Sequence, residues 1–210
     1  DAALIARLRQ EQVPFVCVDT HLPQDGGLPL VEVDNYSAAR QATEYLCQCG
    51  HREIGFIGMQ VPNLYYLNTF GGYIDALKSF GLEYNPAWML SVPYDATLTS
   101  RDFDPLLHER RLPTAFFCAG DAFAIPAMRA AKERGLRIPD DVSFMSMDDL
   151  VISRYLDPPL SSMTFDKERL GAWAMELLYK LLQGEPCDRV NLIPSRVAPR
   201  GTVRDLTKTR

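Results

Sequence analysis

The sequence predicts an α/β fold built on parallel, doubly wound sheets. Short uninterrupted apolar segments, such as Phe15–Val18 and Ala115–Cys118, alternate with longer segments of helical periodicity. A short apolar run that is bounded by turn residues is typical of a strand buried on both faces of a parallel sheet. Because such strands alternate with helices along the chain, the pattern indicates βαβ units and not an antiparallel sandwich.

The expected elements follow one another without an internal repeat. Strands are expected over residues 15–18, 30–33, 54–57, 89–92, 115–118 and 142–147, and helices over residues 2–12, 37–46, 69–80, 100–109, 121–134 and 168–182. Ser37, Thr69 and Asp121 are placed as helix N-caps, because their side-chain oxygens can accept hydrogen bonds from free backbone N–H groups. The tail over residues 190–203 is expected to be extended, with interruptions at Pro194 and Pro199.

Composition and charge exclude several classes of function. The 210 residues are 47% hydrophobic and 23% charged, an ordinary globular balance, and the net charge of -5 argues against a chain that grips phosphates by itself. No stretch approaches the ~18 consecutive apolar residues of a membrane helix, and the first residues lack the pattern of a signal peptide. Five cysteines without a close pattern favour a reducing cytoplasm over a disulfide framework.

Neither a metal site, nor another cofactor, nor an enzymatic centre is expected. Cys47, Cys49 and His51 are superficially metal-like, but positions two apart on a helix face different directions and no second ligand cluster follows. We interpret the two cysteines as ordinary, partly buried thiols. The remaining histidines, His21 and His108, lie in expected loops or helix ends, with no nucleophile motif and no glycine-rich phosphate loop.

Carboxylates stand at the ends of several expected strands, which is where parallel sheets bind ligands. The residues at these ends are Asp19, Asp34, Gly120–Asp121 and Asp148–Asp149. Carboxylate oxygens suit hydroxyl-rich ligands, because each oxygen can accept two hydroxyl hydrogens. The same acids could instead cap the next helix, and capping is the favoured interpretation for Asp121. Asp19 and Asp148 have no immediate helix to cap and are favoured as ligand contacts.

Several segments resemble, in order and at the same spacing, the motifs of one family of regulators. They are Val33–Tyr36 with Ala39–Ala42 and Gly50–Gly58, Gly72–Tyr73 with Ala76–Leu77, Pro113–Ala115 with Asp121, Gly135–Ser143, Met147–Asp149 and Pro158–Ser162. Each segment is only moderately specific by itself. Together they extend over nearly the whole chain, which therefore resembles the effector-binding domain of the LacI/GalR family of bacterial transcription repressors.

The resemblance implies a two-lobed, periplasmic-binding-protein-like fold in which the chain crosses between lobes near Asn35, Thr164 and Pro194. Lobe one would comprise residues 1–34 and 165–193, and lobe two residues 35–164 and 194–210. Family members begin with a helix-turn-helix, a hinge helix and several βα units, which would all precede the first residue here. We therefore expect lobe one to be incomplete and operator DNA to be contacted only through a head that this chain does not contain.

The resemblance also implies an allosteric sensor, which binds a small effector between the lobes and acts as a homodimer. Carried over residue by residue, it assigns Asp19 and Asp148 to ligand hydroxyls, Tyr94 to an aromatic platform and Phe165 to a further ligand contact. Tyr94 could instead be a loop aromatic that is half buried against the preceding proline. Asp149 is expected to tie down the loop that follows it.

Two positions depart from the family pattern, and the first of them favours a neutral effector. By family analogy the ligand is often a sugar and sometimes a nucleobase or nucleoside, and a sugar is the expected class. Thr69 stands where many members have an arginine that clamps the ligand, and Gly120 replaces an asparagine. A phosphorylated effector would miss that arginine. The alternative is a sugar-binding protein of a transport system, which shares the architecture but would need a signal peptide.

Overall fold

The structure is a computed structural model that describes residues 2–19, 28–59, 64–92, 101 and 112–208. The chain divides into two compact units: unit 1 comprises residues 1–34 and 165–194, and unit 2 comprises residues 35–164 and 195–210. Each unit contains a sheet whose registered strand pairs are parallel, so the predicted α/β class is confirmed. Across the described segments, no helix combines the length and the apolarity needed to cross a bilayer.

Unit 2 is built on a six-stranded sheet with the strand order β4-β3-β5-β6-β7-β9. Its strands are β3 (Ile54–Met59), β4 (Met89–Val92), β5 (Ala115–Cys118), β6 (Ser143–Ser146), β7 (Ser161–Phe165) and β9 (Ser195–Ala198). The sequence did not predict β7, because Ser161 and Ser162 interrupt any apolar run although both are fully buried. The Ser161 hydroxyl accepts a hydrogen bond from the Arg200 N–H, and the Ser162 hydroxyl donates one to the Asp121 carboxylate.

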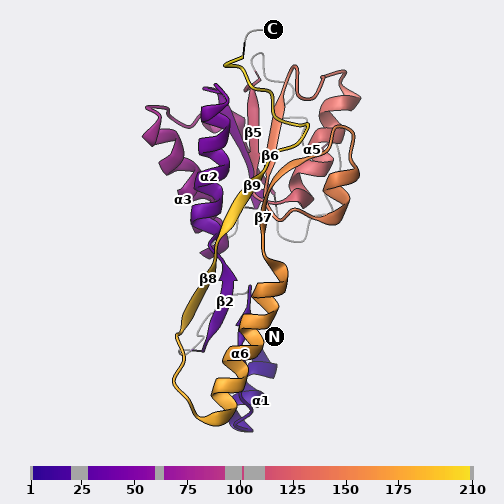
Figure 1. Cartoon of the computed structure of the whole chain (residues 1–210). Helices are drawn as coiled ribbons and strands as arrows, with labels where there is room; N and C mark the ends of the chain where they lie inside the picture. Colours follow the sequence, from indigo (N-terminus) through magenta and orange to yellow (C-terminus); the bar gives the residue numbers. More distant parts are fainter. Residues whose placement is uncertain (1, 20–27, 60–63, 93–100, 102–111, 209–210) are drawn as a thin grey trace. The chain divides into compact units, whose positions relative to one another are not determined.

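Helices cover both faces of this sheet. Figure 1 shows α2 (Asn35–Gln48) and α3 (Leu64–Ser79) on one face and α5 (Asp121–Glu133) on the other. Large side chains alternate accordingly along the strands: Phe117 packs in the α2–α3 layer, whereas the preceding Phe116 packs in the α5 layer. Two short 3-10 helices, η1 (Pro86–Trp88) and η3 (Val151–Tyr155), complete the described part of the unit.

Helices α2 and α3 approach each other closely at Gly72. A Cβ atom on Gly72 would lie 2.3 Å from the Tyr36 carbonyl oxygen, whereas one on the neighbouring Gly71 would lie 3.7 Å from the Tyr36 ring. The Tyr36 hydroxyl donates a 2.7 Å hydrogen bond to Asp75 across the same pair of helices. The absence of a side chain at Gly72 therefore sets the spacing of this layer.

The three predicted N-caps are wrong. Helix α2 begins at Asn35 and α3 at Leu64, so Ser37 and Thr69 lie inside helices. Residues upstream of Thr69 continue the apolar face of α3, and the Tyr66 ring stacks on Phe70 at 5.5 Å, which extends the helix toward its N-terminus. Asp121 is the first residue of α5, where Gly120 is the N-cap, and its side chain bonds elsewhere. The helix expected over residues 100–109 lies outside the described residues except at Arg101.

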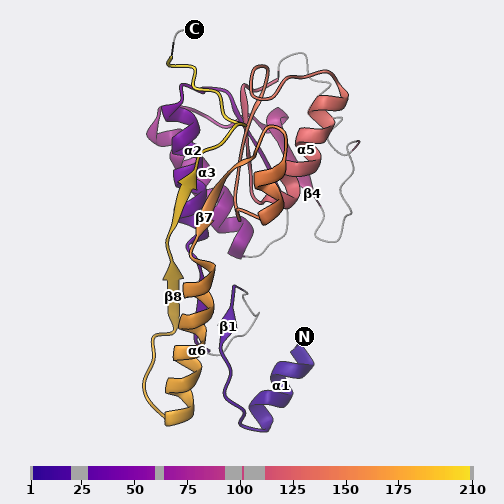
Figure 2. The same ribbon diagram turned by 45° about the vertical axis from the view of Figure 1, so that its right-hand side comes forward.

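Unit 1 contains a three-stranded parallel sheet of β1 (Cys17–Val18), β2 (Leu30–Val33) and β8 (Val190–Ile193), in the order β1-β2-β8. Its helices are α1 (Ala2–Gln10) and α6 (Lys167–Gln183), and Figure 2 shows α6 running along β8. Ala174 and Leu177 of α6 pack on Val31 and Ile193 of the sheet. Strand β1 is shorter than the predicted residues 15–18, and among the described strands its partner is β2.

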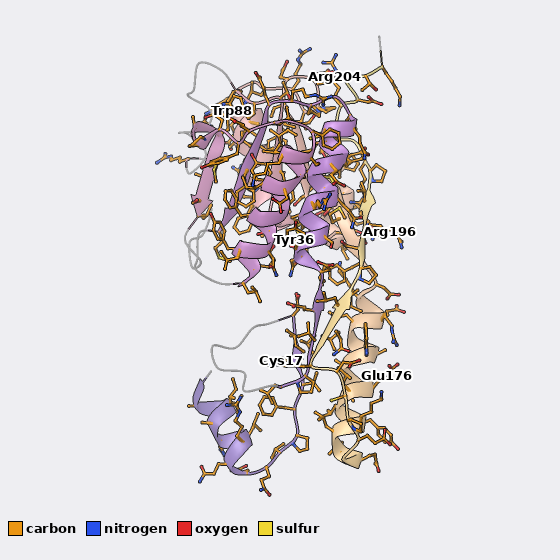
Figure 3. The ribbon with its side chains drawn as sticks, turned by 90° about the vertical axis from the view of Figure 1, so that its left-hand side faces the viewer. Cys17, Tyr36, Trp88, Glu176, Arg196 and Arg204 are labelled. Atoms are coloured by element: carbon orange, nitrogen blue, oxygen red, sulfur yellow. The ribbon has the colours of Figure 1, made fainter. Side chains whose placement is uncertain are left out.

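A buried histidine links the C-terminal tail to the rest of unit 2. The His51 side chain, 1% exposed, bonds to the Thr114 hydroxyl at 2.9 Å and to the Arg204 carbonyl oxygen at 3.0 Å. Figure 3 shows Arg204 and Trp88 at the end of unit 2 where the strands begin, with Tyr36 toward the opposite end. Burial lowers the pKa of His51 to about 4, so the imidazole is neutral at physiological pH.

We expect Gly72→Ala to destabilise the chain by roughly 1–3 kcal/mol, because the new methyl group collides with a backbone carbonyl. Gly71→Ala is the matched control: its methyl group makes ordinary contacts, and alanine favours a helix over glycine by about 1 kcal/mol. Urea denaturation measures both effects. Equal destabilisation by the two substitutions would contradict the proposed helix spacing.

We expect acidification to destabilise the chain through His51. The pKa of His51 is about 4 in the folded chain, whereas a solvent-exposed histidine, as in the unfolded chain, has a pKa of 6.5. Between these two pH values the unfolded chain therefore binds more protons than the folded chain. The free energy of unfolding should therefore fall as the pH drops from 6.5 toward 4, by up to about 1.4 kcal/mol per pH unit from this residue, and be insensitive to it above pH 7. The measurement is urea denaturation at a series of pH values, with His51→Gln as the reference. Parallel pH profiles for the two proteins would show that another group is responsible.

Candidate functional site

The candidate site lies at the carboxyl edge of the unit 2 sheet, by which we mean the residues that follow β5 and β6 and the first turns of α3 and α5. Parallel strands place their carboxyl ends at one edge of a sheet, and ligands bind there in open α/β folds. Strand β5 is followed by Ala119 and Gly120, and β6 by Met147 and Asp148. In Figure 1 this is the lower end of unit 2.

The carboxyl edge brings together Asp148, Gly120 and Phe123. The Asp148 carboxylate is half-buried, and its Oδ2 atom lies 3.1 Å from the position that a Cβ atom on Gly120 would occupy. The Phe123 ring is 3.4 Å from the same position. A hydrogen-bond acceptor and an apolar ring therefore flank a residue without a side chain. This combination can accept ligand hydroxyls while an apolar ligand face packs on the ring.

The turn that carries Asp148 has an unusual backbone. Both Asp148 (φ 92°) and Asp149 (φ 44°) lie in the left-handed region, which costs non-glycine residues conformational energy. The Asp149 carboxylate, 2% exposed, pairs with Arg200 at 2.6 Å and Arg154 at 2.9 Å. Burial alone would raise the pKa of Asp149, but the hydrogen bonds from Arg154 and Arg200 outweigh burial and lower it. Asp149 thus ties down its loop, as predicted.

Two aromatic residues of the carboxyl edge were missed by the sequence analysis. Phe123 lies in the first turn of α5, and Tyr65, in the first turn of α3, donates a hydrogen bond to the Ala119 carbonyl oxygen. Both follow a strand by only a few residues. A helix that starts directly after a parallel strand exposes its first turn at the carboxyl edge, and this is the signal that could have identified them.

The other expected ligand contacts are placed differently. Thr69 is fully buried, and its hydroxyl donates to the Tyr65 and Tyr66 carbonyl oxygens within α3, at 2.9 and 3.2 Å. Tyr94 lies outside the described residues. The remaining two expected ligand contacts, Asp19 and Phe165, belong to unit 1. Asp19 is exposed at the end of β1, and Phe165 is half-buried with the Lys167 ammonium 5.3 Å from its ring centroid.

The two cysteines that superficially resemble metal ligands are buried thiols. Among the residues that the structure describes, no group of three or more His, Cys, Asp or Glu side chains is arranged to hold a metal ion. Burial raises the pKa of Cys47 to about 11 and also raises that of Cys49. Both thiols are thus protonated at neutral pH.

Comparison with known proteins identifies the family. A model of the periplasmic binding protein-like domain matches residues 43–203. The chain is 29% identical over 198 residues to the HTH-type transcriptional repressor PurR of Pasteurella multocida, covering 94% of this chain and 58% of that protein. It is 31% identical over 178 residues to the repressor CytR of Escherichia coli K12, covering 84% of this chain and 52% of that protein.

Solved structures agree with this assignment. A LacI-type regulator of Bacillus cereus superposes with a TM-score of 0.82 at 27% identity, covering 97% of this chain and 72% of that chain. The regulator CelR in complex with cellobiose superposes with a TM-score of 0.81 at 26% identity, covering 96% of this chain and 62% of that chain. The chain spans somewhat more than half the length of the two curated relatives. It belongs to the family of periplasmic binding protein-like domains and is an effector-binding domain of the LacI type.

Proposed function

We propose that this chain is the ligand-sensing core of a bacterial LacI-type repressor and that its effector is a neutral, hydroxyl-rich molecule, with a sugar as the first choice. The observation that carries the proposal is the half-buried Asp148 carboxylate at the carboxyl edge, beside Gly120 and the Phe123 ring. Such a carboxylate makes charge-assisted hydrogen bonds with hydroxyl groups, and sugar rings pack their C–H faces on aromatic rings. In this scheme unit 1 is lobe one and unit 2 is lobe two.

The charges around Asp148 favour a neutral effector. The Asp149 carboxylate engages the side chains of both Arg154 and Arg200. Thr69 stands where many family members carry an arginine, and its hydroxyl is used inside α3. A phosphorylated ligand would bring further negative charge beside the Asp148 carboxylate and would miss that arginine. The complex of the related CelR with cellobiose supports a sugar as the ligand class.

The relatives favour a regulator over the alternatives. PurR and CytR are both named as transcriptional repressors, which supports a cytoplasmic sensor more than a transport-type sugar-binding protein. They also support a non-enzymatic role. DNA binding would be a property of the intact repressor, in which effector binding changes the DNA-binding heads.

We further propose that the regulator is a homodimer and that η3 contributes to the dimer interface. Val151, Ile152 and Tyr155 on this short helix are 71%, 53% and 78% exposed, respectively. Three large apolar side chains clustered on one surface element are typical of a protein–protein contact. A two-fold symmetric pair of chains would bury this surface in both subunits.

We expect Asp148→Asn to weaken effector binding at least about tenfold, because replacing the carboxylate removes charge-assisted hydrogen bonds of roughly 1.5–3 kcal/mol each. Neutral monosaccharides, disaccharides and nucleosides, together with phosphorylated forms of the same compounds, are first screened by thermal shift. A ligand at a hundred times its dissociation constant should add about 2.7 kcal/mol of stability. Titration calorimetry on the hits then compares the variants.

Asp140→Asn is the matched control for that titration. Asp140 precedes β6, whereas Asp148 follows it, so the two residues lie at opposite ends of the same strand. The substitution makes the same change of charge and should leave the affinity for the effector unchanged. A hit that Asp148→Asn binds as tightly as the parent would disprove the role of Asp148. Hits confined to phosphorylated compounds would overturn the neutral effector.

We expect the intact regulator to sediment as a dimer at micromolar concentration and Val151→Asp to shift it to monomer, because a charge would be buried in the interface. At 71% exposure, Val151 can be replaced without disturbing the core. Leu206→Asp, at a 41% exposed position of the C-terminal tail, is the control and should remain dimeric. A monomeric parent protein, or a dimer that persists in Val151→Asp, would argue against this interface.

A further inference from the structure

We propose that Asp121 is a positioning residue that sets the orientation of the Asp148 carboxylate for effector binding, an inference that rests on the proposed function. The starting point is the turn itself. Two successive non-glycine residues, Asp148 and Asp149, adopt positive φ values of 92° and 44°. Such a conformation persists only where neighbouring groups hold it, and it is frequent at functional sites.

Asp121 holds both ends of this turn. Its backbone N–H donates a 3.0 Å hydrogen bond to the carbonyl oxygen of Met147, the residue before Asp148. Its carboxylate Oδ2 accepts a 2.8 Å hydrogen bond from the N–H of Leu150, the residue after Asp149. One residue at the start of α5 therefore fixes the two peptide groups that flank the strained pair.

Asp121 also reaches the middle of the turn through Ser162 of β7. Its Oδ1 atom accepts a 2.8 Å hydrogen bond from the Ser162 hydroxyl, whose oxygen in turn accepts a 3.1 Å bond from the Asp149 N–H. The Ser153 hydroxyl of η3 donates to Oδ2 at 2.5 Å. Asp121, Ser153 and Ser162 are all fully buried, so no solvent replaces a lost partner.

The hydrogen bonds of Asp121 fix the backbone of the turn, and the backbone determines where the Asp148 carboxylate lies at the carboxyl edge. Asp148 Oδ2 lies 3.1 Å from the Cβ position of Gly120, with the Phe123 ring on the same residue. A change of φ at Asp148 would therefore move the carboxylate against Gly120 or away from the ring. Displacement of a binding group by about 1 Å can cost on the order of a hundredfold in a functional interaction.

The loop as a whole has a second anchor that does not involve Asp121. The Asp149 carboxylate pairs with Arg154 and Arg200, the latter from the tail after β9. Loss of one hydrogen bond to Asp121 should therefore leave the loop in place while changing the orientation of the turn. This separates a positioning role from a purely structural one.

The test compares two neighbouring serines of β7. Ser161 and Ser162 are both fully buried and both accept a hydrogen bond from a backbone N–H, from Arg200 at 2.9 Å and from Asp149 at 3.1 Å, respectively. Ser162→Ala removes the link from Asp121 to the turn. Ser161→Ala removes a comparable bond to the backbone N–H of Arg200 and leaves the hydrogen bonds of Asp121, and the Arg200 side chain that pairs with Asp149, unchanged. Asp121→Asn, which replaces one acceptor oxygen by a donor, is the direct variant.

Crystal structures of the three variants of this 210-residue chain, and calorimetric titration with cellobiose, D-ribose and inosine, provide the readouts. In Ser162→Ala and Asp121→Asn, we expect the Asp148 carboxylate to move by about 1 Å and the affinity for whichever probe binds to fall tenfold or more. Ser161→Ala should lower the melting temperature comparably but leave the carboxylate and the affinity unchanged.

An unmoved Asp148 in Ser162→Ala, or an equal loss of affinity in Ser161→Ala, would overturn the positioning role. If Asp121→Asn does not fold, the two serine variants decide the question. If the parent chain binds none of the probes, the proposed sugar or nucleoside effector has failed in its own test. The crystal structures still decide whether Asp121 positions Asp148.

Discussion

The need to cover both faces of a parallel sheet is the constraint on which the rest of unit 2 depends. Its central strands are apolar on both sides, so helices must pack on each face. Phe117 and Phe116 enter different layers from consecutive positions, which only a double layer of helices can accommodate. The same βαβ connectivity gathers the carboxyl ends of the strands, and the helices that follow them start there. The same packing that buries the core therefore also brings together the residues of the carboxyl edge.

Much of this architecture could be predicted from the apolar runs alone. The strands at Leu30–Val33, Met89–Val92 and Ala115–Cys118 have the predicted bounds. Strand β7 could not be found in this way, because its buried serine hydroxyls are accommodated by hydrogen bonds that no local pattern reveals. The starts of α2 and α3 were misplaced for a related reason: tertiary packing extended these helices beyond the residues that looked like caps.

The candidate site was predictable to the extent that it depends on strand ends. That reasoning selected Asp148 and Gly120, which lie together in the structure, and assigned Asp149 to its loop. It misjudged Asp121, whose carboxylate crosses to β7 and to the turn after β6 instead of capping its own helix. A side chain at the first position of a helix can cap its own helix or bond to neighbouring elements. Which of the two occurs depends on the strands that pack beside it. The aromatic residues Phe123 and Tyr65 were overlooked because their helices, and not the strands, present them.

The burial of the cysteines gives the two units separate built-in reporters. Cys17 lies buried in the sheet of unit 1, whereas Cys47, Cys49 and Cys118 lie buried in unit 2. Burial raises the pKa of Cys47 to about 11 and that of Cys118 well above its usual range, so neither is reactive while its surroundings stay closed. The rate at which a thiol reagent modifies each cysteine therefore follows the local opening of the unit that contains it. The opening of each unit can thus be followed through its native cysteines, without engineering a labelling site.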